Sequence, residues 1–325
     1  MAVSPSSLSY RSILLTGGQG FVGGWLLPRL IDALSSEARL TIMGRGGQPA
    51  TGRINHVTAD LRDAAAVHAV VREVSPDLVL HLAAQSSVAQ SAGTAGDTWA
   101  INLGGSLALA QACAAIDFAG TFLFVSSAEV YGLAFNTGVA SEATALLPQS
   151  AYGRSKAAAE AMLADALPRD ARLIVARPGN HSGPGQDDRF VLPSFAKQIA
   201  DIERGNVSPV LRVGNLEAER DFLDVRDVID AYLALLATAP NLPKRTIFNI
   251  ASGRSQRIAD LLQQLLALSD APITVERDPD RLRPSDIARA ALSNDAIRQA
   301  TGWQPTRMIE AMLSDLLAKE RRRTM

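Results

Sequence analysis

Short apolar runs, often β-branched, alternate with longer stretches of helical spacing through the first half of the chain. Each short run has the length of a buried strand, and each longer stretch has the length of a helix. The expected strands are Ile13–Thr16, Leu40–Met43, His56–Thr58, Leu78–Leu82, Phe122–Ser126 and Leu173–Ala176. The expected helices are Phe21–Leu34, Ala64–Val74, Ile101–Ile116 and Ser155–Ala166. This alternation predicts an α/β fold with a doubly wound parallel sheet covered by helices on both faces.

The alternation breaks after about residue 178. Glycine and proline cluster at Pro178–Gly185, and the next expected strands, Thr246–Ile250 and Ile273–Glu276, stand apart from one another. We therefore expect residues 1–178 to form the sheet domain and residues 179–325 to form mainly a smaller α/β lobe that binds the substrate. Segments at about 221–250 are expected to return to the sheet domain.

Composition and charge narrow the class of protein. The 325 residues carry 32 Lys and Arg against 33 Asp and Glu, so a net charge of −1 gives no reason to expect nucleic acid or an anionic membrane as a partner. No run approaches the roughly 20 apolar residues that span a bilayer. With one cysteine, Cys113, and scattered histidines, we expect neither an intrachain disulfide nor a metal site. These features predict a cytoplasmic protein.

A glycine-rich turn follows the first expected strand. Gly17, Gly20 and Gly23 have the spacing Gly-x-x-Gly-x-x-Gly, and Phe21 and Val22 open the next helix. Residues without Cβ let the backbone approach a pyrophosphate, and the N–H groups at the start of the helix favour that anion. The arrangement predicts a dinucleotide site on a Rossmann-type sheet.

The end of the second expected strand indicates which dinucleotide binds. It reads Met43-Gly44-Arg45 and lacks the carboxylate that would bind the ribose hydroxyls of NAD. A guanidinium suits a 2′-phosphate, so NADP(H) is favoured; NAD(H) stays open if Arg45 is only a solvated loop residue. Asp60, after the third strand, either caps a loop or hydrogen-bonds the adenine amino group.

Tyr152 and Lys156 are candidates for proton transfer. Their i, i+4 spacing puts both on one helix face, where the ammonium would lower the pKa of the phenol from about 10 toward working pH. Ser127 follows a strand, at the edge where open α/β sheets bind ligands. It is placed to hydrogen-bond the carbonyl oxygen that Tyr152 protonates while hydride moves at carbon.

With these motifs in this order, the chain resembles the extended short-chain dehydrogenase/reductase family over nearly its whole length. The family's glycine turn, Ser/Thr and Tyr-x-x-x-Lys are matched by the residues above. The resemblance implies that Lys156 also holds the nicotinamide ribose, and that a homodimer forms through Ile101–Ile116 and the helix carrying Tyr152. The further cofactor contacts that it implies are Leu61, Leu82, Ala83, Ala84 and Val125.

The second half of the chain is similar to family members that act on GDP-mannose derivatives. The similarity lies in Arg177–Gln186, Arg220–Val228, Arg281–Asp286 and Thr301–Pro305. It implies NAD(P)H-dependent reduction of the C4 keto group of GDP-4-keto-6-deoxy-D-mannose to GDP-D-rhamnose, with GDP-6-deoxy-D-talose as the other possible product. The implied substrate contacts are Ser86, Ser127, Glu129, Asn180, Val191, Lys197, Arg220 and Arg283.

Glu129 leaves a related reaction open. Ser127-Ala128-Glu129 fits a motif of GDP-mannose 4,6-dehydratases, in which the glutamate would remove the C5 proton. Those enzymes carry an arginine-rich stretch where this chain has Ser182–Gln186, which favours the reductase. The alternatives are a dehydratase, an epimerase, or a dinucleotide-binding protein without catalysis. For Arg220 and Arg283, an ion pair with Asp221 or Asp286 is the alternative to phosphate binding.

Overall fold

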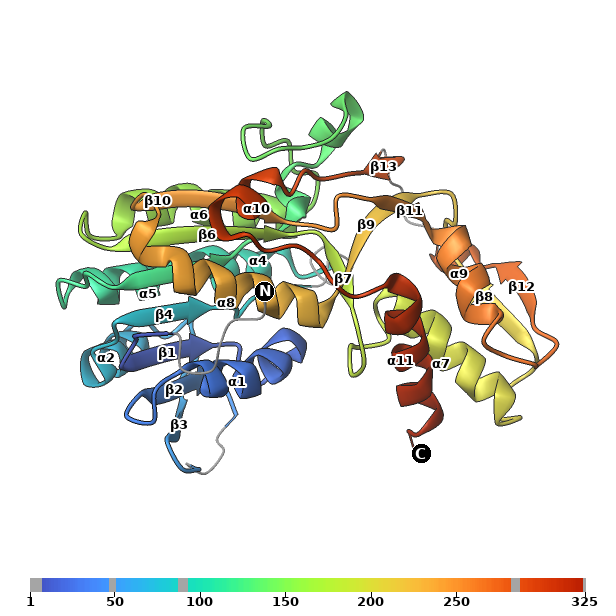
Figure 1. Ribbon diagram of the computed structural model, residues 1–325, viewed down its shortest axis with the longest axis horizontal. Coiled ribbons are helices and arrows are strands. Elements are labelled where there is room, and N and C mark those ends of the chain that lie inside the picture. The colour runs from blue at the N-terminus through green and yellow to red at the C-terminus, as the bar shows by residue number, and fades with distance from the viewer. Residues whose placement is uncertain (1–7, 47–50, 87–92, 282–286, 324–325) are drawn as a thin grey trace.

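The computed structural model describes residues 8–46, 51–86, 93–281 and 287–323 (Figure 1). Its largest layer is a parallel seven-stranded sheet in the order β10-β6-β5-β4-β1-β2-β3, so the predicted doubly wound sheet is confirmed. The strand order reverses between β1 and β4, where such sheets bind ligands. The strands are β1 (Ser12–Thr16), β2 (Arg39–Gly44), β3 (Ile54–Thr58), β4 (Leu78–His81), β5 (Thr121–Val125), β6 (Arg172–Pro178) and β10 (Arg245–Ile250).

Helices cover both faces of this sheet because successive strand residues point to opposite sides. Leu15 and Leu80 enter one apolar core, against α1 (Phe21–Ala33) and α8 (Val225–Thr238). Leu14 and Val79 enter the other. The helices on that second side are α2 (Ala64–Val74), α5 (Gly105–Ala114) and α6 (Ala151–Ala166). Within the part of the chain described, no helix is both long and apolar enough to cross a membrane.

Two helices begin earlier than the apolar spacing predicts. α6 begins at Ala151 instead of 155, because the Ser150 hydroxyl accepts the Gly153 N–H at 3.0 Å and caps it. The helix expected to begin at 101 starts with α4 (Ala95–Trp99) and passes through a π-helical turn, η1 (Ala100–Gly104), into α5. Residues 95–97 at the start of α4 are exposed, so the apolar pattern does not extend to the first turn of the helix.

The C-terminal half of the chain forms a smaller lobe with its own apolar core. α7 (Val191–Glu203), α9 (Ile258–Leu266) and α11 (Ile309–Arg321) enclose that core together with the strand β8 (Val210–Val213), which pairs with β12 (Thr274–Arg277). A second small sheet lies between this lobe and the main sheet (Figure 1). Its strands are β7 (Asn180–Ser182), β9 (Glu219–Asp224), β11 (Ser255–Arg257) and β13 (Arg289–Ala290).

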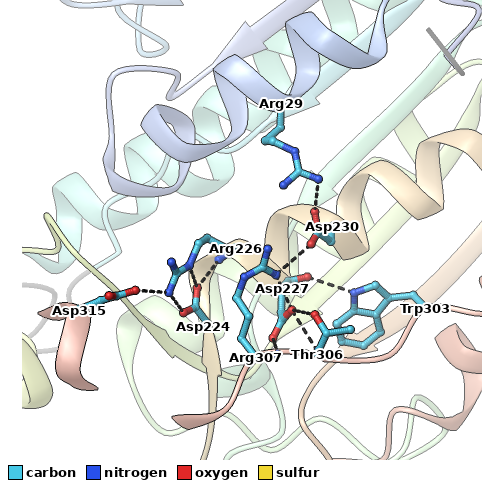
Figure 2. A network of polar contacts seen from close by, with 9 residues as sticks. All are labelled: Arg29, Asp224, Arg226, Asp227, Asp230, Trp303, Thr306, Arg307 and Asp315. Carbon is cyan, nitrogen blue, oxygen red and sulfur yellow. Dashed lines mark hydrogen bonds and ion pairs between the residues drawn. The ribbon is translucent and has the colours of Figure 1, made fainter. Parts of the chain in front are cut away.

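Polar contacts tie the lobe and the C-terminal segment to α8, as Figure 2 shows. Asp227 on α8 accepts hydrogen bonds from the backbone and side chains of Thr306 and Arg307. Arg226 donates to Asp315 on α11 at 2.7 Å. The short helix α10 (Asp295–Thr301) contributes to the core beneath α8. The chain therefore crosses from the sheet domain to the lobe and back more than once.

Candidate active site

The turn between β1 and α1 has no room for a side chain at two of its glycines, Gly17 and Gly23. Gly17 has φ +76°, and a Cβ there would lie 2.6 Å from the backbone nitrogen of Ala83. A Cβ at Gly23 would lie 2.4 Å from the Gly17 carbonyl oxygen. α1 begins directly after the turn at Phe21, so its free N–H groups face the same space. This cradle fits the pyrophosphate of a dinucleotide.

A cleft of about 740 Å³ opens beside the turn at the carboxyl edge of the sheet. Phe21 and Val22 open α1, while Leu82 follows β4 and Val125 ends β5, so these residues belong to the same edge. The predicted residues that line the cleft are Gly17, Arg45, Asp60, Leu61, Ala83, Ala84 and Ser86. Lining residues that the sequence analysis did not single out include Gln19, Arg62, Asp97 and Arg189. No local spacing indicates Arg189, because it comes from the other lobe.

Asp60 caps its own loop. Its carboxylate accepts the Arg62 guanidinium at 2.7 and 3.1 Å and the Arg62 backbone N–H at 2.9 Å. These hydrogen bonds, with a smaller contribution from the nearby Arg45, lower the pKa of Asp60 to about 2. Of the two roles expected for Asp60, the loop cap is therefore seen directly, and the adenine contact stays a prediction.

Ser127, Tyr152 and Lys156 lie together beside the end of β5. Ser127 caps the short helix η2 (Ala128–Val130) by accepting the Glu129 N–H at 3.1 Å, and its hydroxyl lies near enough to Tyr152 to lower the pKa of the phenol. Tyr152 and Lys156 are both buried on α6. The Lys156 ammonium donates to the Val125 carbonyl oxygen at 2.7 Å. The three residues thus have the arrangement that acid catalysis at a carbonyl requires.

The pKa of Tyr152 differs from the expectation. The pKa of the phenol is raised to about 12: burial is the largest cause, the neighbouring Ser127 hydroxyl partly opposes it, and Glu129 adds to it. Burial also lowers the pKa of Lys156 to about 7, against the effect of Glu160. The prediction of a lowered pKa for Tyr152 is wrong in this structure, because the largest influence on that pKa is desolvation of the phenolate and not the charge of Lys156.

A buried polar network lies behind these residues. Glu160, one turn after Lys156, accepts hydrogen bonds from Ser126 and from the Arg177 guanidinium, and the two charged side chains are only 6% and 3% exposed. Arg177 also donates to the Tyr131 hydroxyl at 2.9 Å. Satisfied buried networks of this kind fix side-chain positions. No local spacing indicated this network, since its members come from separate segments: Ser126 follows β5, Tyr131 follows η2, Glu160 lies on α6 and Arg177 on β6.

Glu129 and Arg220 interact electrostatically on the substrate side. Burial raises the pKa of Glu129 and Arg220 lowers it, although water still reaches the carboxyl group. The Arg220 guanidinium donates to the backbone carbonyls of residues 219 and 287. The carboxylate of Asp221 accepts two backbone N–H groups of the loop after β10, at 2.8 and 2.9 Å. The contacts with the two backbone carbonyls hold Arg220 near Glu129. Its contact with a phosphate stays a prediction.

The other predicted substrate contacts are spread over the lobe. Asn180 is exposed at the start of β7, and Val191 is exposed at the start of α7. Lys197, farther along α7, forms an ion pair with Asp188 at 2.5 Å. Arg283 lies outside the described residues. Their roles toward a nucleotide sugar stay predictions.

Comparison with known proteins agrees with this geometry. The family model described as GDP-mannose 4,6 dehydratase matches residues 14–316. The chain is 35% identical to the GDP-6-deoxy-D-mannose reductase of Pseudomonas aeruginosa, over 95% of this chain and 96% of that protein. It is similar to the structure of RMD from Pseudomonas aeruginosa complexed with NADPH, with a TM-score of 0.82, 34% identity, and coverage of 96% of this chain and 100% of that chain. The UDP-glucose 4-epimerase of Thermus thermophilus in complex with NAD gives a TM-score of 0.81 at 25% identity, covering 96% and 99%.

Proposed function

Since the chain belongs to the GDP-mannose 4,6-dehydratase family, within the extended short-chain dehydrogenases/reductases, we propose that it reduces GDP-4-keto-6-deoxy-D-mannose at C4, with NADPH as reductant. The product would be GDP-D-rhamnose. The observation that carries this proposal is the grouping of Ser127, Tyr152 and Lys156 at the edge of the sheet that also holds the glycine turn. The 35% identity to a reductase of this kind supports the choice of reaction.

The residues of the chain suit reduction of a carbonyl group. The bound dinucleotide supplies the hydride from its nicotinamide. The glycine turn and Arg45 hold its nucleotide part, and Lys156 holds its nicotinamide ribose. A pKa of about 12 keeps Tyr152 protonated near neutral pH, which an acid that protonates a carbonyl oxygen needs. Ser127, whose hydroxyl lies beside that phenol, orients the same oxygen.

Glu129 favours one second candidate, a 4,6-dehydratase of the same family. Its raised pKa and its proximity to Tyr152 suit removal of a proton next to a keto group. A dehydratase recycles its hydride and consumes no NADPH. The stoichiometry of NADPH consumption therefore separates the two reactions.

The test mixes the purified protein with GDP-4-keto-6-deoxy-D-mannose and NADPH, follows the loss of reduced-nicotinamide absorbance, and repeats the assay with GDP-mannose alone. Consumption equal to the keto sugar added is the expected result, and NMR of the product distinguishes rhamnose from 6-deoxy-talose. Conversion of GDP-mannose without consumption of NADPH would replace the reductase by the dehydratase.

Arg45 should set the preference for NADPH. Replacing it with Gln removes a guanidinium at the 2′-phosphate position, so we expect the Kd for NADPH to rise about tenfold while the Kd for NADH changes little. Fluorescence titration of both reduced dinucleotides measures the two constants. An equal loss for NADPH and NADH would mean that Arg45 does not contact the 2′-phosphate.

We also infer a cytoplasmic homodimer. α5 and α6, the helices expected at its interface, pack against each other on one face of the sheet. A symmetric pair of these helices would form a four-helix contact between protomers. Sedimentation equilibrium should give twice the 34.4 kDa mass of the chain; the mass of a single chain would contradict the dimer.

A further inference from the structure

The loop between β7 and α7 reaches from the lobe to the dinucleotide cleft. Trp25 on α1 donates its indole N–H to the Pro184 carbonyl oxygen at 3.2 Å, and Phe21 stacks on His181 with ring centroids 6.4 Å apart. These contacts fix the loop over the start of α1. Arg189, near the end of the loop, consequently lines the cleft together with Arg45.

The Arg189 guanidinium is held by a weak contact. Its Nε donates to the Asp187 carboxylate at 2.7 Å, but the two side chains are 50% and 46% exposed, and such exposed pairs contribute little. Asp187 also accepts the Arg189 backbone N–H at 2.9 Å and has Arg323 nearby. The carboxylate therefore keeps favourable partners when the guanidinium turns away.

The arginines that line the cleft differ in how firmly they are bound. Arg62 is bound to Asp60 through two hydrogen bonds and lies 3.8 Å from Asp97. Arg45 and Arg189 are the other two lining arginines. A dinucleotide brings a diphosphate, and in NADP(H) a 2′-phosphate, whose oxygens match the planar donors of a guanidinium.

We propose that Arg189 is a phosphate-binding residue for the dinucleotide, supplied by the substrate lobe. Its guanidinium leaves Asp187 and donates to the phosphate oxygens of the cofactor. Because Val191 begins α7 two residues later, this contact also fixes the start of the helix that carries the expected substrate contacts Val191 and Lys197. Dinucleotide binding then favours binding of the nucleotide sugar. The proposal depends on the dinucleotide site alone, so it can be tested whether or not the keto sugar is reduced.

Binding titrations with matched variants test the contact. We expect Arg189→Gln to raise the Kd for NADPH about tenfold and Arg189→Lys to restore part of the affinity. Arg298→Gln, which removes an exposed arginine from α10, is the control and should change nothing. Competition with ADP and with 2′,5′-ADP shows whether the diphosphate or the 2′-phosphate is bound. Equal NADPH affinities of Arg189→Gln and Arg298→Gln would overturn the proposal.

Two further measurements test release from Asp187 and coupling to the lobe. Asp187→Asn keeps the oxygen that accepts the backbone N–H and removes the charge, so NADPH should bind more tightly; weaker binding would count against the proposal. Saturating NADP⁺ should increase the affinity for GDP in the parent protein and not in Arg189→Gln. No increase in the parent, or an equal increase in the variant, would overturn the coupling.

Discussion

Replacing Tyr152 with Phe should lower kcat by about 10³-fold, within the range that a positioned acid contributes. The substitution removes one hydroxyl, and with it the proton donor for the carbonyl oxygen. The ring keeps its place in α6, because Phe fills the same buried volume. The Kd for NADPH should therefore stay within about twofold, a change smaller than the loss of one hydrogen bond.

The control is Tyr10→Phe, which removes a hydroxyl at the opposite end of the sheet. Tyr10 donates to Thr121, the first residue of β5, far along the strand from Ser127. Steady-state kinetics and NADPH titration of both variants give kcat and Kd. If Tyr152→Phe kept more than about a tenth of kcat, a loss below the usual range for a general acid, Tyr152 would not be the proton donor. If it lost NADPH binding as well, its effect would be structural.

The fold was predictable where burial follows the apolar pattern. The strands β1, β2, β4, β5 and β6 of the main sheet are almost fully buried, and parallel strands covered on both faces appear as continuous apolar runs. The strands β7, β8, β9, β11 and β13 were not predicted, and β12 was displaced by one residue. β8 alternates between buried and exposed positions over only four residues, and every residue of β12 is exposed. In strands at the surface of a small lobe, the difference in burial between the two faces is small. The alternation of apolar and polar residues is then too weak to predict the strand.

The candidate site was predictable where its chemistry is local in the sequence. The glycine turn and the pair Tyr152 and Lys156 are set by spacings of three and four residues. Arg189 and the surroundings of Arg220 depend on contacts between segments far apart in the chain. The raised pKa of Tyr152 depends on burial. A local spacing contains neither the contacts between distant segments nor the burial of a side chain, so both had to come from the structure.

Replacing Asp227 with Ala should lower the free energy of unfolding by about 3–4 kcal/mol, since the buried carboxylate accepts four hydrogen bonds and each contributes about 1 kcal/mol. The side chain is only 1% exposed, and it accepts four hydrogen bonds from Thr306 and Arg307 at 2.7 to 3.2 Å (Figure 2). Alanine would leave two backbone N–H groups of the C-terminal segment without these acceptors and would weaken the hold on the guanidinium.

Asp230→Ala is the matched control, since Asp230 lies one turn later on α8 and carries the same charge. It pairs with Arg29 and Arg307 but is 25% exposed, so its loss should cost about 1 kcal/mol or less. Urea unfolding of both variants measures the difference. A clearly larger loss for Asp227→Ala would show that the buried carboxylate joins the C-terminal segment to α8. Equal losses would mean that the apolar packing of Trp303, whose indole N–H donates to the Asp227 carbonyl oxygen, holds the segment instead.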